Sequence, residues 1–260
     1  MAERMIVVID AGHGGKDPGA TYEGRQEKDD NLRLAMAVGR ILADSGVDVR
    51  YTRTDDSYNT PLEKATMAND AEADFLVSIH RNAMPVPGTG SGIEVLVFED
   101  KGVQGMLAKN IGEALSKTGF TNLGTVERPG LVVLRRTKIP SVLVEAGFID
   151  NGEDNKLFNQ NFEAIAQAIA DGILKSVKEQ QETRVEYYQI QVGAYKVHTL
   201  AEEQANVLKA QGFPAFVVYE DGLYKVRVGA FRNIDNAVRM EQSLRQYDYS
   251  TFMVKKPAVS

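Results

Sequence analysis

The chain has 260 residues, with 30 Lys and Arg against 36 Asp and Glu, 43% hydrophobic residues, three His, and neither Cys nor Trp. This length allows one large or two modest domains with a real hydrophobic core, which excludes disordered and fibrous classes. The lack of Cys excludes disulfides, thiolate zinc sites, iron–sulfur clusters and cysteine nucleophiles, so any metal must be held by His and carboxylates. The net charge of −6 argues against a nucleic-acid partner.

The N-terminal segment holds an apolar run of only five residues, 5–9, before Asp10. This run is too short for the core of a signal peptide, and no other segment approaches the roughly 20 apolar residues of a membrane span. We therefore expect synthesis in the cytoplasm, without a visible signal peptide or membrane span. Residues 1–183 carry 20 basic and 28 acidic side chains, whereas residues 184–260 carry 10 and 8, which indicates two domains.

Residues 5–178 alternate short apolar runs with stretches of helical periodicity. This alternation predicts an α/β fold with a mainly parallel, twisted sheet flanked by crossover helices. The expected strands are 5–9, 47–51, 75–79, 93–98, 131–134 and 141–144. The expected helices are about 27–43, 61–71, 102–117 and 162–178.

The polar stretch 178–184 predicts a helix tail and a short linker, with a domain boundary near 180–185. Beyond it lies an internal repeat, because YQIQVGAY (188–195) matches YKVRVGAF (224–231). Each copy predicts a strand followed by a helix. The remaining expected elements are helices at 200–210 and 233–246 and strands at 215–219 and 251–254. The resulting order, βαββαβ, describes one small α+β domain, since two copies are too few for a solenoid.

Two of the three His follow expected strands, His13 after the first and His80 after the third. The carboxyl ends of parallel strands face one crevice, where such folds build their sites, so the two imidazoles can meet. Glu145 follows the strand 141–144, and Glu27 opens the helix after the glycine-rich loop 12–19. We therefore expect four chemically active groups at one edge of the sheet.

Two His and one carboxylate around an open fourth position form a hydrolytic zinc arrangement, and a second carboxylate can act as general base. Each residue also has a structural interpretation: a hydrogen-bonded imidazole, an Arg partner for Glu145, and a first-turn helix acid for Glu27. The pairing of the two His favours the metal site. The sequence around His198 is typical of a surface loop, so we assign this residue no role. The glycine-rich loop lacks the residues of a P-loop or dinucleotide fingerprint, so nucleotide binding is disfavoured.

Several ordered motifs surround these residues: DAGHGGKDPGA (10–20), Glu27, YTRTD (51–55), AN (68–69), ADFLVSIHRNA (73–83), GIE (92–94) and IPSVLVEAGF (139–148). With them, residues 5–178 strongly resemble the zinc-dependent N-acetylmuramoyl-L-alanine amidases of the amidase_3 family. The resemblance implies cleavage of the amide between the lactyl group of N-acetylmuramic acid and L-alanine, in a catalytic domain at 1–180. It also implies roles for individual residues: one Zn²⁺ held by His13, Glu27 and His80, Glu145 as catalytic base, and Asn82 and Glu94 at the substrate.

Two residues depart from the family's pattern. Lys64 stands where many members carry Arg, and Arg81 stands where a small residue is common, which bears on substrate specificity. The segment 27–43 is one plain helix without the inserted autoinhibitory helix of some relatives. We therefore expect an open site that is active without a protein activator.

The C-terminal repeat resembles the SPOR domain over 185–260, which implies binding to peptidoglycan glycan strands stripped of stem peptides. If Tyr188 and the alternate residues after it face the helices, then Gln189 and Gln191 face the open side of the sheet. The second copy places Lys225 and Arg227 on that side. Amides and cations there suit the hydroxyl and N-acetyl groups of a sugar chain, although a merely solvated sheet face is the alternative.

The leading interpretation is a peptidoglycan hydrolase, an autolysin that acts on stem peptide and glycan strand after lysis or release, as in mother-cell lysis during sporulation. A phage endolysin would have the same chemistry. Another zinc hydrolase, such as a carboxypeptidase or deacetylase, would share the activated water. A non-catalytic wall-binding protein is disfavoured because all four chemical positions are occupied. We expect a monomer with neither nucleic acid nor membrane as partner.

Overall fold

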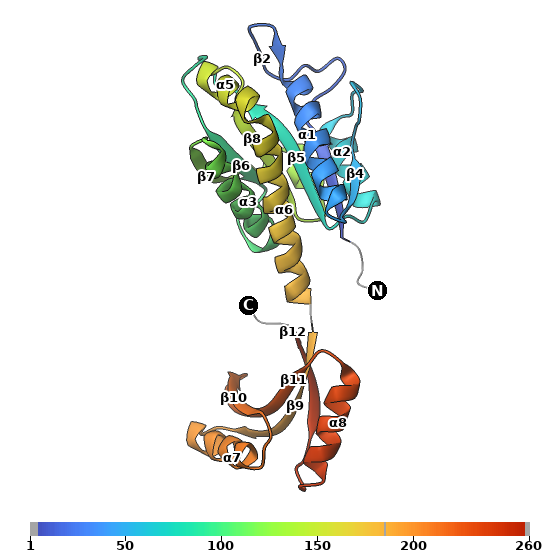
Figure 1. Cartoon of the computed structure of the whole chain (residues 1–260), viewed down its shortest axis with the longest axis vertical. Helices are drawn as coiled ribbons and strands as arrows, with labels where there is room; N and C mark the ends of the chain where they lie inside the picture. The colour runs from blue at the N-terminus through green and yellow to red at the C-terminus, as the bar shows by residue number, and fades with distance from the viewer. Residues whose placement is uncertain (1–4, 185, 258–260) are drawn as a thin grey trace. The chain divides into compact units, whose positions relative to one another are not determined.

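The computed structural model describes residues 5–184 and 186–257, which form two units divided between Lys178 and Glu179 (Figure 1). Within these residues no helix is both long and apolar enough to cross a membrane. The strands of the first unit are β1 (Ile6–Ala11), β2 (Thr21–Tyr22), β3 (Arg25–Gln26), β4 (Asp48–Tyr51), β5 (Phe75–Asn82), β6 (Ile93–Val97), β7 (Asn122–Glu127) and β8 (Ser141–Phe148). Its α-helices are α1 (Glu27–Asp44), α2 (Pro61–Asp70), α3 (Gly102–Leu115), α4 (Val132–Arg136), α5 (Gly152–Gln160) and α6 (Phe162–Arg184).

The first unit is built on a six-stranded sheet in the order β4-β1-β5-β8-β6-β7. Neighbouring strands pair in parallel except β6 and β8, which are antiparallel. The predicted mainly parallel sheet with crossover helices is thus confirmed. The central strands β1, β5 and β8 are buried on both faces, which explains their nearly unbroken runs of Val, Ile and Leu.

Helices cover both faces of this sheet, and Figure 1 shows α1 and α6 along one of them. The larger core, which includes residues of α1, α3 and α6, contains Val7, Leu34, Phe75, Leu107 and Ile169. The smaller core, which includes residues of α2 and α4, contains Val8, Ala68, Leu76, Val133 and Leu143. Because side chains alternate along a strand, His80 faces the same side as Leu76. The site therefore opens on the side of α2 and α4.

The prediction of a strand at 131–134 is wrong. These residues lead into helix α4, and Val133 and Leu134 are buried in the smaller core. A run of four apolar residues does not by itself distinguish a strand from a buried helical turn. The sequence patterns also missed the edge strand β7, the helix α5 and the β2–β3 hairpin.

Two strands run further than predicted, so two candidate residues lie within strands rather than after them. Strand β5 continues through His80, and β8 continues through Glu145. Strand β1 ends at Ala11, two residues before His13. Helix α6 continues to Arg184 through the stretch predicted partly as linker.

The second unit has the predicted βαββαβ order, with strands β9 (Glu186–Tyr195), β10 (Ala215–Glu220), β11 (Leu223–Phe231) and β12 (Phe252–Pro257) and helices α7 (His198–Ala210) and α8 (Ile234–Arg245). Its antiparallel sheet has the order β10-β11-β9-β12. The helices cover one face through a core that includes Ile190, Val192, Ala205, Val226 and Leu244. The alternation predicted for β9 is confirmed, since Ile190 and Val192 are buried while Gln189 and Gln191 are partly exposed.

Candidate metal and catalytic site

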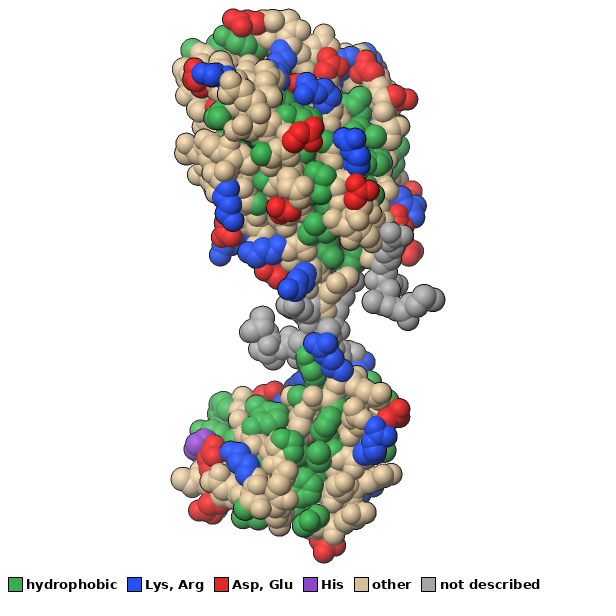
Figure 2. Space-filling view, viewed as in Figure 1, with side chains coloured by type: hydrophobic (Ala, Val, Ile, Leu, Met, Phe, Trp, Pro, Cys, Tyr) green, Lys and Arg blue, Asp and Glu red, His purple; other side chains and the backbone are tan. Residues whose placement is uncertain are grey.

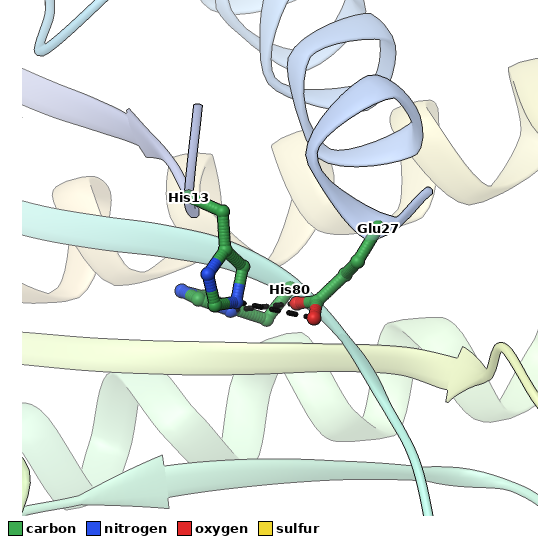
Figure 3. Close-up of side chains that lie close together, drawn as sticks. All are labelled: His13, Glu27 and His80. Carbon is green, nitrogen blue, oxygen red and sulfur yellow. Dashed lines mark hydrogen bonds and ion pairs between the residues drawn. The ribbon is translucent and has the colours of Figure 1, made fainter. Parts of the chain in front are cut away.

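Three of the four predicted residues form one cluster, drawn in Figure 3. His13 comes from the loop after β1, Glu27 from the first turn of α1, and His80 from β5. Nε2 of His13 lies 3.1 Å from Oε2 of Glu27, and Nδ1 of His80 lies 2.8 Å from Oε1 of the same carboxylate. One ligand atom from each residue lies within 4.8 Å of the other two, a grouping that could hold a metal ion.

Glu27 is buried, and its carboxylate is surrounded by donors. Besides the two imidazoles it accepts hydrogen bonds from the backbone N–H of Ala20 and Arg81 and from Nδ2 of Asn31. Burial by itself would raise the pKa of Glu27, but the hydrogen bonds and charges of His13 and His80 outweigh it and hold this pKa well below its ordinary value. The carboxylate is therefore ionised and ready to bind a cation.

Asp17 orients His13 from the opposite side of the ring, since its Oδ2 lies 2.8 Å from Nδ1 of the imidazole. A carboxylate on the remote nitrogen fixes the ring and strengthens the other nitrogen as a ligand. Burial alone would lower the pKa of His13, but Glu27 and Asp17 raise it to about 9 in the metal-free chain. The cluster thus has high negative potential, which favours a divalent cation in place of the proton.

Glu145 of β8 lies opposite His80 in the strand pairing with β5 and opposite Glu94 in the strand pairing with β6. No atom of the described residues hydrogen-bonds its Oε2, which is also shielded from solvent. Burial raises the pKa of Glu145 to about 7, with the charges of Glu27 and Glu94 acting in the same direction and His80 opposing them. The charged groups that act on its pKa are those of the site, and none of them is an Arg. The alternative interpretation of Glu145 as the structural partner of an Arg is therefore not supported.

Of the two predicted substrate residues, Glu94 lies opposite Glu145 in the pairing of β6 with β8. Nδ2 of Asn82 donates to Oε1 of Glu94 over 2.8 Å, which links the end of β5 to β6. A cavity of about 330 Å³ adjoins the two imidazoles on the side of α2 and α4. Its lining combines Asp10, His13, Asp17, Asn59, Lys64 and His80 with apolar groups of the segment 130–133 and Leu143.

The sequence suggested that Arg81 bears on substrate specificity, but its side chain lies away from the site. Its guanidinium is buried on the other side of the sheet, where it binds Asp30 and Asn155 and stacks over the ring of Phe158. Only its backbone N–H reaches Glu27. Sequence reasoning also missed Asp17 as the partner of His13, although its position four residues after that His could have indicated it.

The predicted glycan-binding residues of the second unit differ in their environments. Arg227 is only 3% exposed, and its guanidinium binds both carboxylate oxygens of Glu220 and Oε1 of Gln189. Lys225 is bound to Asp221 over 2.6 Å but keeps a partly exposed side chain. Arg227 is therefore a buried cation neutralised by Glu220, whereas Gln189, Gln191 and Lys225 remain partly exposed.

Two imidazoles and a carboxylate thus meet at one edge of a mixed sheet flanked by helices and could hold a metal ion, a donor set that also occurs in metal-dependent hydrolases. The chain belongs to the Amidase_3 family of N-acetylmuramoyl-L-alanine amidases, whose model matches residues 7–175, and a SPOR domain model matches residues 185–255. It is therefore an N-acetylmuramoyl-L-alanine amidase, a hydrolase of the bacterial cell wall.

Relatives and solved structures agree with this assignment. The chain is 36% identical to the sporulation-specific N-acetylmuramoyl-L-alanine amidase of Bacillus subtilis over 83% of this chain and 85% of that protein. An amidase structure from Clostridium difficile has a TM-score of 0.64 at 32% identity, over 68% of this chain and 98% of that one. The catalytic domain of CwlV from Bacillus (Paenibacillus) polymyxa has a TM-score of 0.62 at 32% identity, over 67% and 98% of the two chains.

The raised pKa of Glu145 predicts a measurable effect on stability. In the metal-free chain the folded state keeps a proton on Glu145 up to pH about 7, whereas the unfolded chain releases it near the ordinary value of 4.5. Stability is therefore lost as the pH rises through this window. Glu145→Gln should make the metal-free chain more stable than wild type by about 3 kcal/mol at pH 8 and leave it nearly unchanged at pH 4.5.

Chemical denaturation in the presence of a chelator measures this difference. Glu163→Gln, in the exposed first turn of α6, is the control and should change stability by less than about 1 kcal/mol at pH 8. Equal stabilities of wild type and Glu145→Gln at pH 8 would mean that Glu145 is not held in an unfavourable environment.

Proposed function

We propose that the chain hydrolyses the amide between the lactyl group of N-acetylmuramic acid and L-alanine with a single zinc ion held by His13, Glu27 and His80. The observation that carries this proposal is the grouping of one ligand atom from each of these residues within 4.8 Å. Nitrogen and oxygen donors from two His and one carboxylate suit Zn²⁺ and leave a fourth position for water or substrate. When bound, zinc supplies a Lewis acid for the scissile carbonyl and lowers the pKa of a bound water.

The protein's own groups account for the remaining steps. Glu145 is the general base: it takes a proton from the attacking water and returns it to the leaving amine of L-alanine. Its elevated pKa in the metal-free chain suits a group that must both accept and release a proton near neutral pH. Asp17 keeps His13 oriented, and Asn82 and Glu94 contact the substrate next to the base.

We assign residues 1–180 to the catalytic domain and residues 185–260 to a SPOR domain that binds the glycan strand of peptidoglycan. The family matches at 7–175 and 185–255 support this division.

Figure 2 shows acidic and basic side chains interspersed over the visible face of the first unit. Such a mixed surface gives no broad positive field, which argues against a nucleic-acid partner. Similarity to a sporulation-specific amidase along most of both chains supports an autolytic role in sporulation.

Substitution of the general base tests the mechanism. Glu145→Gln should reduce turnover of purified peptidoglycan at least about 100-fold, because a carboxamide cannot accept the proton. Zinc content should stay at one ion per chain, since Glu145 is not a proposed ligand. Mass spectrometry of wild-type products should find new L-alanine amino termini without new reducing sugar ends.

Three results would count against this mechanism. Retained turnover in Glu145→Gln would make another group the base. New termini at a different amide would make the chain another kind of hydrolase. Activity that persists after dialysis against a chelator would remove the metal from the reaction.

Glycan binding can be tested on strands stripped of stem peptides, which carry no scissile amide for the first unit. We propose that Gln191 and Lys225 make the glycan contacts and that Arg227 and Gln189 hold the sheet face in shape with Glu220. Gln191→Ala combined with Lys225→Ala in the full chain should weaken co-sedimentation about 10-fold, as expected for two polar contacts. Lys209→Ala, exposed at the end of α7, is the control. Unchanged co-sedimentation of the double variant would move the glycan site elsewhere.

A further inference from the structure

The loop that carries His13 has a strained backbone. His13 itself has a φ of +59°, and the two glycines after it have φ values of +134° and +55°. A left-handed conformation is unfavourable for a residue with a Cβ atom, so the surroundings must hold it in place. The loop also passes tightly against the second imidazole, since a Cβ atom on Gly12 would lie 2.3 Å from the ring of His80.

Two cationic side chains hold three successive carbonyl groups of this loop. Nζ of Lys64 donates to the carbonyl of Ala11 over 2.6 Å and approaches that of His13 at 3.4 Å. Nε of Arg53 donates to the carbonyl of Ala11 over 3.0 Å, and its Nη2 donates to that of Gly12 over 2.9 Å. Lys64 reaches the loop from helix α2, and Arg53 follows strand β4.

Lys64 is only 3% exposed, so its charge needs a buried partner. That partner is Asp10, whose Oδ1 lies 2.9 Å from Nζ. The hydroxyls of Thr52 and Ser78 donate to the two carboxylate oxygens of Asp10. Asp10 is thus fully satisfied, and the ammonium group is directed at the loop carbonyls.

We propose that Lys64 is a positioning residue for the metal site: its bonds to the carbonyls of Ala11 and His13 keep the strained loop in the conformation in which His13 meets Glu27 and His80. This inference rests on the proposed zinc site. Without these bonds the loop relaxes, the binding-competent conformation becomes a minor population, and the apparent zinc affinity falls in proportion.

A purely structural role for Lys64 would be to neutralise Asp10, and a double variant separates the two roles. Lys64→Met alone leaves a buried carboxylate without its cation and destabilises the fold. Asp10→Asn combined with Lys64→Met removes both charges together, so stability recovers, but the carbonyls of Ala11 and His13 still lack the ammonium donor. Lys64→Arg keeps a cationic donor in the same helix position.

The experiment titrates Zn²⁺ into the metal-free full chain against a competing chromophoric chelator and records thermal melting of each metal-free variant. The double variant should melt close to wild type yet bind Zn²⁺ at least about 10-fold more weakly. Lys64→Arg should bind within about threefold of wild type, as should Lys101→Met, which removes an exposed lysine paired with Glu99. The visible spectrum of the Co²⁺-loaded double variant should also differ from that of wild type, because His13 is displaced.

Wild-type zinc affinity and an unchanged Co²⁺ spectrum in the double variant would overturn the proposal and leave Lys64 as the counter-charge of Asp10. Failure of wild type itself to bind Zn²⁺ would instead overturn the metal site, and the positioning role with it.

Discussion

The carboxylate of Glu27 is the interaction on which the site depends. It is buried at the first turn of α1, and both imidazoles and two backbone N–H groups point at it. An ionised acid in such a place is stable only because every oxygen is matched by a donor. The same convergence that stabilises the acid places two nitrogen ligands and one oxygen ligand around a common point. The packing of α1 and the loop after β1 against the sheet therefore also brings the proposed zinc ligands together.

Much of this arrangement could be predicted from the sequence. The buried strands before His13 and His80 made both imidazoles meet at one edge of a parallel sheet, and Glu27 followed as the first residue of the next helix. The apolar run at 131–134 is too short to show a helical periodicity, so its sequence cannot distinguish a strand from a buried helical turn. The burial of Arg81 and the neutralisation of Arg227 by Glu220 depend on contacts far apart in the chain, which no local pattern contains.

The two units differ in the environments of their polar and charged side chains. The first contains a strained loop, buried ion pairs and a carboxylate oxygen of Glu145 without a hydrogen-bond partner among the described residues, all of which cost stability and lie around the proposed metal site. The second has a regular antiparallel sheet whose open face carries amides and compensated charges. Such a face offers several weak polar contacts, which suits the proposed binding of a glycan strand while the first unit cleaves the amide.

The most direct test of the account is a crystal structure of the zinc-loaded chain with anomalous data collected at the zinc edge. The account predicts one anomalous peak in the first unit at about 2.0–2.2 Å from a nitrogen of His13, a nitrogen of His80 and a carboxylate oxygen of Glu27. It also predicts that Glu145 lies beside the metal without binding it. A peak elsewhere, or none in a chain that cleaves peptidoglycan, would contradict the proposed site.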